Sequence, residues 1–315
     1  MIRFVLLRLA EGVVTLLASS LLVFAALFLS PGDPIAILIG NRTVSDDTIA
    51  ALREQYHLDE PFLVRWWSWL GEVLTGDLGR SLTYRDDVWN LIEPRLGTTV
   101  MLLALALLAI VVVGVGLGIV AAMSGRRISD LMLGLTSVGV AVPAFVAATL
   151  LITVFAVGLG WFPTFGAGTG FGERLHHLAL PVIALTISAG SYVVRVTRAA
   201  LRDEAQRDPV QTAIGRGLPR GRIVRHHIVR NALTPIATVV AVTLTSMVVG
   251  SIVIEKAFAL DGVGLLLTEA VLRKDFAVVQ AITLILIAFV VVIALLVDLV
   301  QVAVDPRVRA KAVRR

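Results

Sequence analysis

The residue types that usually carry out chemistry are sparse in this chain. Cysteine does not occur among the 315 residues, which excludes disulfide bonds, thiolate metal sites and cysteine nucleophiles. Two adjacent histidine pairs occur, His176-His177 and His226-His227. Adjacent side chains on a helix point to different faces, and no cluster of carboxylates accompanies either pair, so we expect no metal site. No Ser-His-Asp set falls on plausible neighbouring faces, which disfavours a hydrolase.

Glycine motifs that bind nucleotides are absent or out of context. The sequence contains no G-x-x-x-x-G-K-[ST] segment, so the chain cannot hold ATP phosphates in that way. Gly114, Gly116 and Gly118 alternate, but no strand precedes them and apolar residues surround them. We expect them to let two helices approach closely rather than to bind a dinucleotide. The sequence therefore predicts a protein that is not an enzyme and has no cofactor of its own.

The composition indicates a membrane protein. Hydrophobic residues make up 57% of the chain and charged residues 16%, whereas a soluble domain is about half apolar and a quarter charged. Runs free of Asp, Glu, Lys and Arg are long enough to cross a bilayer as helices, at residues 12–32, 96–125, 131–172, 175–194, 231–254 and 276–297. Because these runs are continuous rather than alternating, they favour an all-α protein with six transmembrane helices over a β-barrel.

The third run is longer than one helix needs. Its second part, from Gly158 to Gly172, is rich in glycine and carries Pro163, so we interpret it as a loop or re-entrant segment that follows one span.

The distribution of basic residues predicts the orientation. If the N-terminus lies inside, the inner segments hold 18 of the 28 Lys and Arg residues, and six of the outer ten lie in the long loop 31–96. Long loops translocate largely regardless of charge, so both termini are predicted to be cytoplasmic. All five tryptophans fall in segments predicted to be outside, as in an interfacial aromatic belt. The first run has no clear small-x-small cleavage site and is interpreted as an uncleaved span.

The spans divide the chain into segments: residues 1–32 with the first helix, an extracytoplasmic loop 33–95, a transmembrane core 96–303 and a basic cytoplasmic tail 304–315. Short helices are expected in the outer loop at 46–56 and 58–74. The second has Phe62, Trp66 and Trp69 on one side and would lie along the membrane surface. This loop either caps the bundle or receives a partner or substrate, and both interpretations stay open.

The inner loop 195–230 carries nine arginines and three carboxylates. Asp208 followed by Pro209 predicts a helix start with Asp208 as the cap, and Gly217 predicts its end. Three apolar residues then share one helix face: Val210, Ala213 and Ile214. A helix this short persists only if it is packed, which favours a groove on a partner protein. The alternative is a basic loop that fixes topology and contacts lipid headgroups.

Few polar or helix-breaking residues fall within the spans. Asp298 lies seven residues before Asp305, so it is expected near the inner interface, either in packing or in a translocation pathway. Pro143 and Pro181 lie within spans, where each is expected to kink its helix and can act as a hinge.

The inner loop resembles the EAA-type loop of permease subunits of binding-protein-dependent ABC importers, specifically the oligopeptide and dipeptide (OppB/DppB) type that carries peptides or nickel. Gly217 matches the glycine that follows the family's glutamate by six residues, and Ala213 matches one alanine. Gln211 and Thr212 stand in place of the glutamate and the first alanine. The similarity continues through a basic region and an Asn-Ala-Leu-x-Pro segment: Arg222, His226, Arg230 and Asn231-Ala232-Leu233-Thr234-Pro235.

Five further segments resemble family motifs in the same order along the chain. They are PGDP at 31–34, GDLGRS at 76–81, Val142-Pro143 with Phe145, an E-x-x-F-x-x-x-G-x-G element at 255–264, and DPRVR at 305–309. The fourth element comprises Glu255, Phe258, Gly262 and Gly264, and Asp261 stands where a proline is usual.

The resemblance implies a type I ABC importer permease fold in the cytoplasmic membrane. Such a permease pairs with a second, related permease, and the translocation path runs between them. Two cytoplasmic ATPase subunits, which bind ATP and Mg, dock on the coupling helices, and an extracytoplasmic binding protein delivers the substrate. The coupling residues implied here are Asp208, Gln211, Thr212, Ala213, Ile214, Gly217, Arg222 and His226. The candidate gate or pathway residues are Pro143, Phe145, Glu255, Phe258 and Asp298.

Peptides are the expected substrate, and nickel or another small solute is the alternative. A self-sufficient ion-driven carrier would need buried charges at mid-membrane and internal repeats. The spans are nearly free of charge, which argues against that class. An intramembrane enzyme would need a catalytic constellation, which is not visible in the sequence. Nucleic acid is not an expected partner.

Overall fold

The computed structural model describes residues 2–29, 60–81 and 83–304. Within these ranges the regular elements are helices, apart from one isolated bridge between Arg80 and Asp87. The all-α prediction is therefore confirmed. The motifs at 31–34 and 305–309 and the short helix expected at 46–56 lie outside the described residues.

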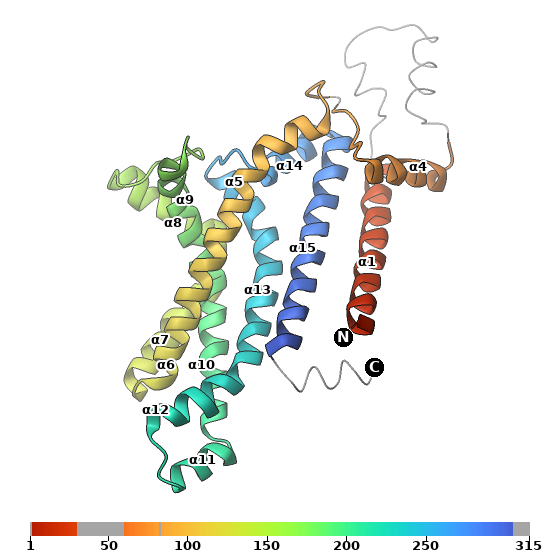
Figure 1. Cartoon of the computed structure of the whole chain (residues 1–315). Coiled ribbons are helices and arrows are strands. Elements are labelled where there is room, and N and C mark those ends of the chain that lie inside the picture. Colours follow the sequence, from red (N-terminus) through yellow and green to blue (C-terminus); the bar gives the residue numbers. More distant parts are fainter. Residues whose placement is uncertain (1, 30–59, 82, 305–315) are drawn as a thin grey trace, which may run out of the picture. The chain divides into compact units, whose positions relative to one another are not determined.

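Most of the predicted spans appear as long apolar helices (Figure 1). In the described part of the chain, five helices are long and apolar enough to cross a membrane. They comprise α1 (Ile2–Phe28), α5–η1–α6 (Val88–Met123), α9–η3–α10 (Phe171–Ala205), α12–η4–α13 (Arg220–Ala257) and α15 (Phe276–Val304). The π-helical segments within them are η1 (Ile110–Val115), η3 (Thr186–Gly190) and η4 (Val224–Val229).

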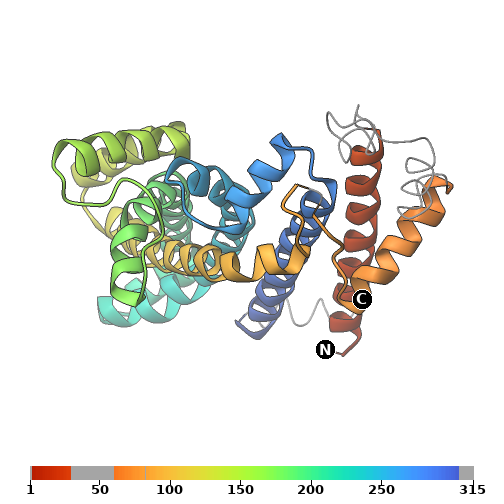
Figure 2. The ribbon, with the colours of Figure 1, turned by 90° about the horizontal axis from the view of Figure 1, so that it is seen from above.

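The sixth span is broken rather than kinked. It consists of α7 (Arg126–Ala141) and α8–η2 (Ala144–Gly158), which meet at an angle of 99°. The change of direction can be followed in Figure 1 and, from above, in Figure 2. Proline lacks an N–H and forces the preceding residue out of the helical region. Val142 is accordingly extended, with φ −83° and ψ 114°, and Pro143 directly precedes α8. The disturbance predicted at Pro143 is therefore confirmed and takes the form of a full break, and the predicted loop after Gly158 is confirmed as well.

Pro181 has a different effect from Pro143. It lies inside α9 (Phe171–Leu185), which continues through η3 into α10 (Ser191–Ala205) as one spanning helix. The π-helical segment follows one turn after the proline. The helix therefore accommodates Pro181 without the break that Pro143 causes.

The contacts within the chain divide it into two units. Unit 1 comprises residues 1–10, 95–265 and 290–315, and unit 2 comprises residues 11–94 and 266–289. Unit 1 contains most of the spans and the inner loop, whereas unit 2 contains most of α1, α4 (Phe62–Thr75) and most of α14 (Val263–Leu272).

Close helix packing holds unit 1 together where glycines face α10. A Cβ atom on Gly114 would lie 3.1 Å from the Val193 side chain, and one on Gly118 would lie 2.5 Å from Thr197 Cβ. Among the described residues, a Cβ atom on Gly116 would meet nothing within 4 Å. The predicted role in close helix approach is thus confirmed for Gly114 and Gly118, which have the spacing of a G-x-x-x-G packing motif.

In unit 2, α4 packs across one end of α1, as Figure 1 shows. The Phe24 ring lies 5.5 Å from Phe62 and 5.7 Å from Trp69, measured between ring centroids. The indole Nε1 of Trp66 donates a hydrogen bond to Ser20 Oγ at 3.3 Å. The aromatic face predicted for this helix is therefore the face that packs against α1. Its placement along the membrane surface stays a prediction.

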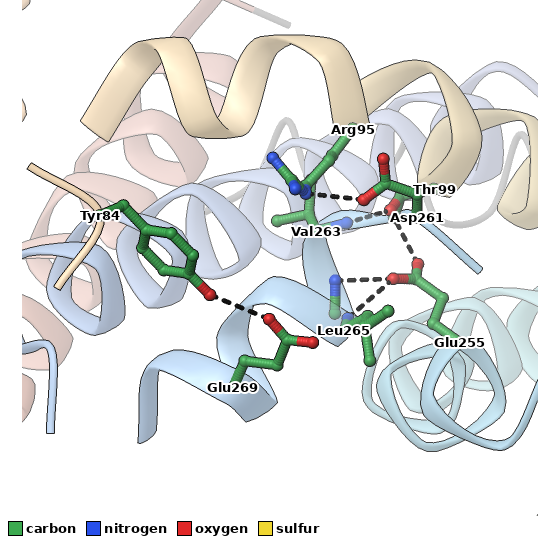
Figure 3. Close-up of polar contacts among 9 residues, drawn as sticks. Tyr84, Arg95, Thr99, Glu255, Asp261, Val263, Leu265 and Glu269 are labelled. Atoms are coloured by element: carbon green, nitrogen blue, oxygen red, sulfur yellow. Dashed lines mark hydrogen bonds and ion pairs between the residues drawn. The ribbon is translucent and has the colours of Figure 1, made fainter. Parts of the chain in front are cut away.

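Three hydrogen bonds in unit 2 join distant parts of the sequence. The Ser81 hydroxyl donates to the buried Asp275 carboxylate at 2.5 Å, and the backbone N–H of Thr83 donates to the same oxygen at 3.2 Å. The Tyr84 hydroxyl donates to Glu269 at 2.9 Å (Figure 3). These contacts fix the segment that follows the GDLGRS motif against the chain on either side of Arg273.

We expect Gly118→Ala to destabilise the protein and Gly116→Ala to leave it unchanged or slightly more stable. The added methyl group at position 118 would clash with Thr197 and with the carbonyl oxygen of Val194, 3.0 Å away, at a cost of about 1–3 kcal/mol. Alanine at position 116 has room and favours a helix over glycine by up to about 1 kcal/mol. Thermal unfolding in mild detergent, followed by tryptophan fluorescence, measures both. Equal melting temperatures for the two variants would contradict the packing interpretation.

Candidate functional site

The inner loop forms a short helix, α11 (Asp208–Gly215), followed by α12 (Arg220–Ile223) and η4 (Figure 1). The helix begins one residue earlier than predicted. Arg207, with extended φ −71° and ψ 150°, is the N-cap residue, and Asp208 is the first helical residue. The prediction that Asp208 caps the helix is therefore wrong. Its carboxylate instead lies in the first turn, where it complements the positive end of the helix dipole.

The end of α11 follows the prediction from Gly217. This residue has φ +69°, in the left-handed region that glycine adopts without strain. The Gly217 N–H donates to the Ile214 carbonyl at 2.9 Å, and the Leu218 N–H donates to the Ala213 carbonyl at 3.2 Å. This pattern satisfies the last carbonyl groups of the helix and reverses the chain direction.

The apolar face of α11 is covered mainly by its own loop. Val210 and Ala213 are buried against Ile223 of α12, and Leu218 and Ile228 pack around them. Ile214, by contrast, is 55% exposed. The prediction that all three apolar residues await a partner is therefore wrong for Val210 and Ala213, because the chain after Pro219 turns back and covers them.

Polar contacts attach α11 to the end of α10. The Gln211 side-chain amide donates to the Ala205 carbonyl at 3.2 Å, and Arg207 pairs with the largely buried Glu204 at 2.9 Å. The sequence pattern gave no role to Glu204. The only sequence signal for this pair is the separation of three residues, because Arg207 lies in the turn between α10 and α11 and not on a helix with Glu204.

The remaining coupling candidates lie on the surface of the loop. Asp208, Gln211, Thr212, Arg222 and His226 are all exposed. The exposed charges of the loop are mostly basic, with Asp203 and Asp208 as its exposed acids. The exposed arginines are Arg207, Arg216, Arg220, Arg222, Arg225 and Arg230. The loop therefore presents a basic surface with Ile214 as an exposed apolar side chain on α11.

The candidate gate or pathway residues lie in three separate places. The first is a buried cluster around Glu255 at the end of α13 (Arg230–Ala257) (Figure 3). The Glu255 carboxyl group accepts hydrogen bonds from Thr99 Oγ1 at 2.7 Å and from the backbone N–H groups of Gly264 at 2.7 Å and Leu265 at 3.1 Å. Thr99 in turn accepts from the Val263 N–H at 2.9 Å. Glu255 and Thr99 thus satisfy the unpaired N–H groups at the start of α14.

The glycines of the same motif make this arrangement possible. A Cβ atom on Gly262 would lie 2.3 Å from a Glu255 oxygen, and one on Gly264 would lie 2.7 Å from Ile252 Cα. The E-x-x-F-x-x-x-G-x-G spacing therefore has a physical explanation, since the turn must pass directly over the carboxyl group. Asp261, which stands where a proline is usual, pairs with Arg95 at 2.8 Å.

Phe258 belongs to the buried cluster around Glu255, whereas the remaining gate or pathway candidates lie elsewhere. Its side chain is buried, and its carbonyl accepts a hydrogen bond from the Gly166 N–H at 3.0 Å. Pro143 and Phe145 lie at the α7–α8 break, where Phe145 is 53% exposed. Asp298 pairs with Arg8 of α1, with 3.1 Å between Nε and Oδ2. The gate candidates therefore do not form one site.

Sequence reasoning missed a further contact between spans. Arg198 on α10 donates from Nε to the buried Ser129 of α7 at 2.7 Å. The two residues are 69 positions apart, so no local pattern links them. Among the residues that the structure describes, no group of three His, Asp or Glu side chains could hold a metal ion.

Comparisons with known proteins cover nearly the whole chain. The family model described as "Binding-protein-dependent transport system inner membrane component" matches residues 114–310, and a model for the N-terminal part of such membrane components matches residues 1–103. A putative peptide permease protein of Brucella ovis is 37% identical, covering 98% of this chain and 99% of its own length.

Two further relatives have similar coverage. A glutathione transport system permease protein of Salmonella typhimurium is 35% identical, covering 99% of this chain and 100% of its own length. A probable peptide ABC transporter permease protein of Sinorhizobium fredii is 31% identical, covering 97% and 99%.

Solved structures resemble the fold. An inward-facing methionine ABC transporter matches with a TM-score of 0.56 and 18% identity, covering 68% of this chain and 96% of the other. An amino acid ABC transporter matches with a TM-score of 0.53 and 19% identity, covering 67% and 93%. The type I importer permease fold predicted for the core agrees with these likenesses. This protein therefore belongs to the family of inner membrane components of binding-protein-dependent transport systems and is a multi-pass permease subunit of an ABC importer.

Proposed function

We propose that this chain is the permease subunit of a peptide importer and forms half of the translocation path together with a second, related permease. The choice of peptide as the substrate rests on the full-length relatives, 31–37% identical, that are named as permeases for peptides or for glutathione. Glutathione is itself a short peptide, so these names agree in chemical class. A binding protein outside the membrane delivers the peptide, and nickel or another small solute is the alternative cargo.

We further propose that α11 is the coupling helix and docks on one of two cytoplasmic ATPase subunits, which hold ATP and Mg. Two features support this role. The helix keeps its shape within its own loop, through the Val210, Ala213 and Ile223 cluster. It is also attached to the end of α10 by Gln211 and by the Glu204–Arg207 pair. A displacement of α11 would therefore move a membrane-spanning helix, as a transmission element requires.

The contact with the ATPase is proposed to involve the exposed side chains of the loop. Ile214 offers apolar area on α11, and Gln211 and Thr212 share the exposed part of the helix. Arg222 and His226 add to the basic surface on α12 and η4. Such a surface fits a groove with an apolar centre and an acidic rim. Gln211 still reaches α10, although the family usually has glutamate at this position.

For Glu255 and Phe258 we propose a structural role in place of a direct contact with substrate. Both side chains are buried, and the Glu255 carboxyl group is already occupied by three hydrogen bonds. They are proposed to fix the start of α14. Pro143, Phe145 and Asp298 remain candidates for a gate or pathway, with Pro143 at the 99° break between α7 and α8.

The proposed substrate is tested by uptake into proteoliposomes that contain the two permeases and the ATPase. With the cognate binding protein outside, ATP inside should drive accumulation of a labelled dipeptide or oligopeptide. Uptake of nickel but not of peptide would contradict the peptide assignment and leave the permease role intact. Uptake by this chain alone, driven by an ion gradient, would contradict both.

Ile214→Asp should uncouple the permease from its ATPase. The residue is exposed and lies outside the loop's buried cluster, so the fold of the loop should survive. A charge at an apolar contact should cost about 2 kcal/mol or more of binding free energy. The measurements are co-purification of the ATPase and ATP-driven uptake, and Ile214→Leu is the matched control. Unchanged co-purification of the Ile214→Asp variant would count against docking at α11.

Glu255→Ala should destabilise the protein by about 2–3 kcal/mol, because it leaves buried N–H groups at the start of α14 without an acceptor. Glu255→Gln retains one oxygen acceptor and should cost less. Thermal unfolding in detergent and peptide uptake are measured on the same preparations. A variant that keeps wild-type stability but loses uptake would contradict the structural role and favour a place in the pathway.

A further inference from the structure

An apolar groove runs between two spanning helices of unit 1. It lies between the α5–η1 helix and α9 and has a volume of about 380 Å³. Its walls consist of aliphatic side chains, among them Leu105, Leu108 and Val112 on one side and Leu175, Ala179 and Val182 on the other. Leu108 and Val112 are more than half exposed in this chain, so the groove is open to its surroundings along the span.

An arginine lies at the end of this groove that is near the start of α9. Arg174 directly precedes the lining residue Leu175 and lies in the first turn of α9, where the span begins at Phe171. Its side chain extends toward α5, since the position of a Cβ atom on Gly97 lies 3.9 Å from Arg174 Nη1. Gly97 is two turns before Leu105 on the same helix. The guanidinium group therefore lies between the two helices at the end of the groove that corresponds to the start of the span.

The side chain of Arg174 lacks a protein partner in the part of the chain that the structure describes. Its Nε atom is buried and makes no hydrogen bond. The neighbouring carboxylate, Glu173, accepts from Thr169 and lies 3.7 Å from His177. A buried donor without an acceptor is costly, and a cation at the membrane boundary normally has a counter-charge. This arginine therefore points to an anionic ligand.

We propose that the groove is a binding site for a glycerophospholipid, with an acyl chain between α5–η1 and α9 and the phosphate on Arg174. Three features support this occupant. The lining is aliphatic and lies within the stretch that crosses the hydrocarbon layer. Arg174 lies at the end of the span, at the depth of the headgroups. Its guanidinium fork also matches phosphate oxygens geometrically. One ligand thus fills the apolar groove and places its phosphate against the guanidinium charge of Arg174.

Two other occupants fit less well. A peptide in transit would bring backbone N–H and C=O groups into a groove whose walls offer them no partners. A helix of the second permease is about 10–12 Å wide with its side chains, so it would cover the groove without filling it. Both alternatives give different results in the experiment that follows.

The test uses the assembled importer in vesicles of phosphatidylethanolamine and phosphatidylglycerol. A trace of phosphatidylglycerol carries a photoreactive group in one acyl chain, and mass spectrometry locates the labelled residues. Label should concentrate on residues 105–113 and 175–182. Arg174→Gln should lower this labelling roughly tenfold, the loss expected for one charge-assisted hydrogen bond. Ala179→Phe, which fills the groove and keeps the arginine, should lower it as well. Arg127→Gln removes an exposed charge elsewhere and should leave it unchanged.

A diacylglycerol with the same photoreactive chain provides the second probe, because it lacks the phosphate and should label the groove weakly. Equal labelling by both probes, or labelling spread evenly around the spanning helices, would overturn the proposal. Absence of label from the groove in the assembled importer would assign it to the second permease. Loss of label on adding excess transported peptide would assign it to the substrate, and both results reject the lipid site.

Discussion

Hydrocarbon offers no hydrogen-bond partner to a polar group, and the structure of this permease follows from that constraint. The spans are helices that satisfy their own backbone. Where a helix must begin inside the protein, a side chain replaces the missing partner, as Glu255 and Thr99 do for the N–H groups at the start of α14. Arg8 and Asp298, which both lie within apolar helices, pair with each other. Arg174 is notable against this background, because the described protein supplies nothing for its Nε atom.

The inner loop meets the opposite constraint, because it lies in water and cannot rely on lipid to keep a short helix formed. An isolated helix of eight residues is marginal. Here the left-handed Gly217 turns the chain back, and Ile223 covers Val210 and Ala213. Two polar contacts then join the helix to α10. The loop is therefore a preformed unit rather than a segment that folds on its partner, and a preformed surface loses less conformational entropy on binding.

The sequence predicts features that local physics determines and misses those that depend on distant residues. Length and hydropathy predict the spans, and the spacing of Gly114 and Gly118 indicates a close helix contact, because both signals come from residues near one another in the sequence. The partner helix α10 is not given by that spacing. Pro143 predicts a disturbance, but the 99° angle depends on what packs around the two halves. Periodicity identifies Val210 and Ala213 as apolar without showing what covers them. Glu255 and its glycines are recognisable as a motif, yet its partner Thr99 lies 156 residues away.

The α5–η1–α6 helix combines both of the contacts that a spanning helix can make. At Gly114 and Gly118 the helix has no side chains, so its backbone packs closely against α10. At Leu105, Leu108 and Val112 it presents aliphatic side chains to the groove beside α9. The π-helical turn from Ile110 to Val115 lies where these two surfaces meet. An extra residue in one turn rotates the following side chains relative to a regular helix. Gly114 within the π turn and Gly118 after it both face α10, whereas the preceding leucines border the groove.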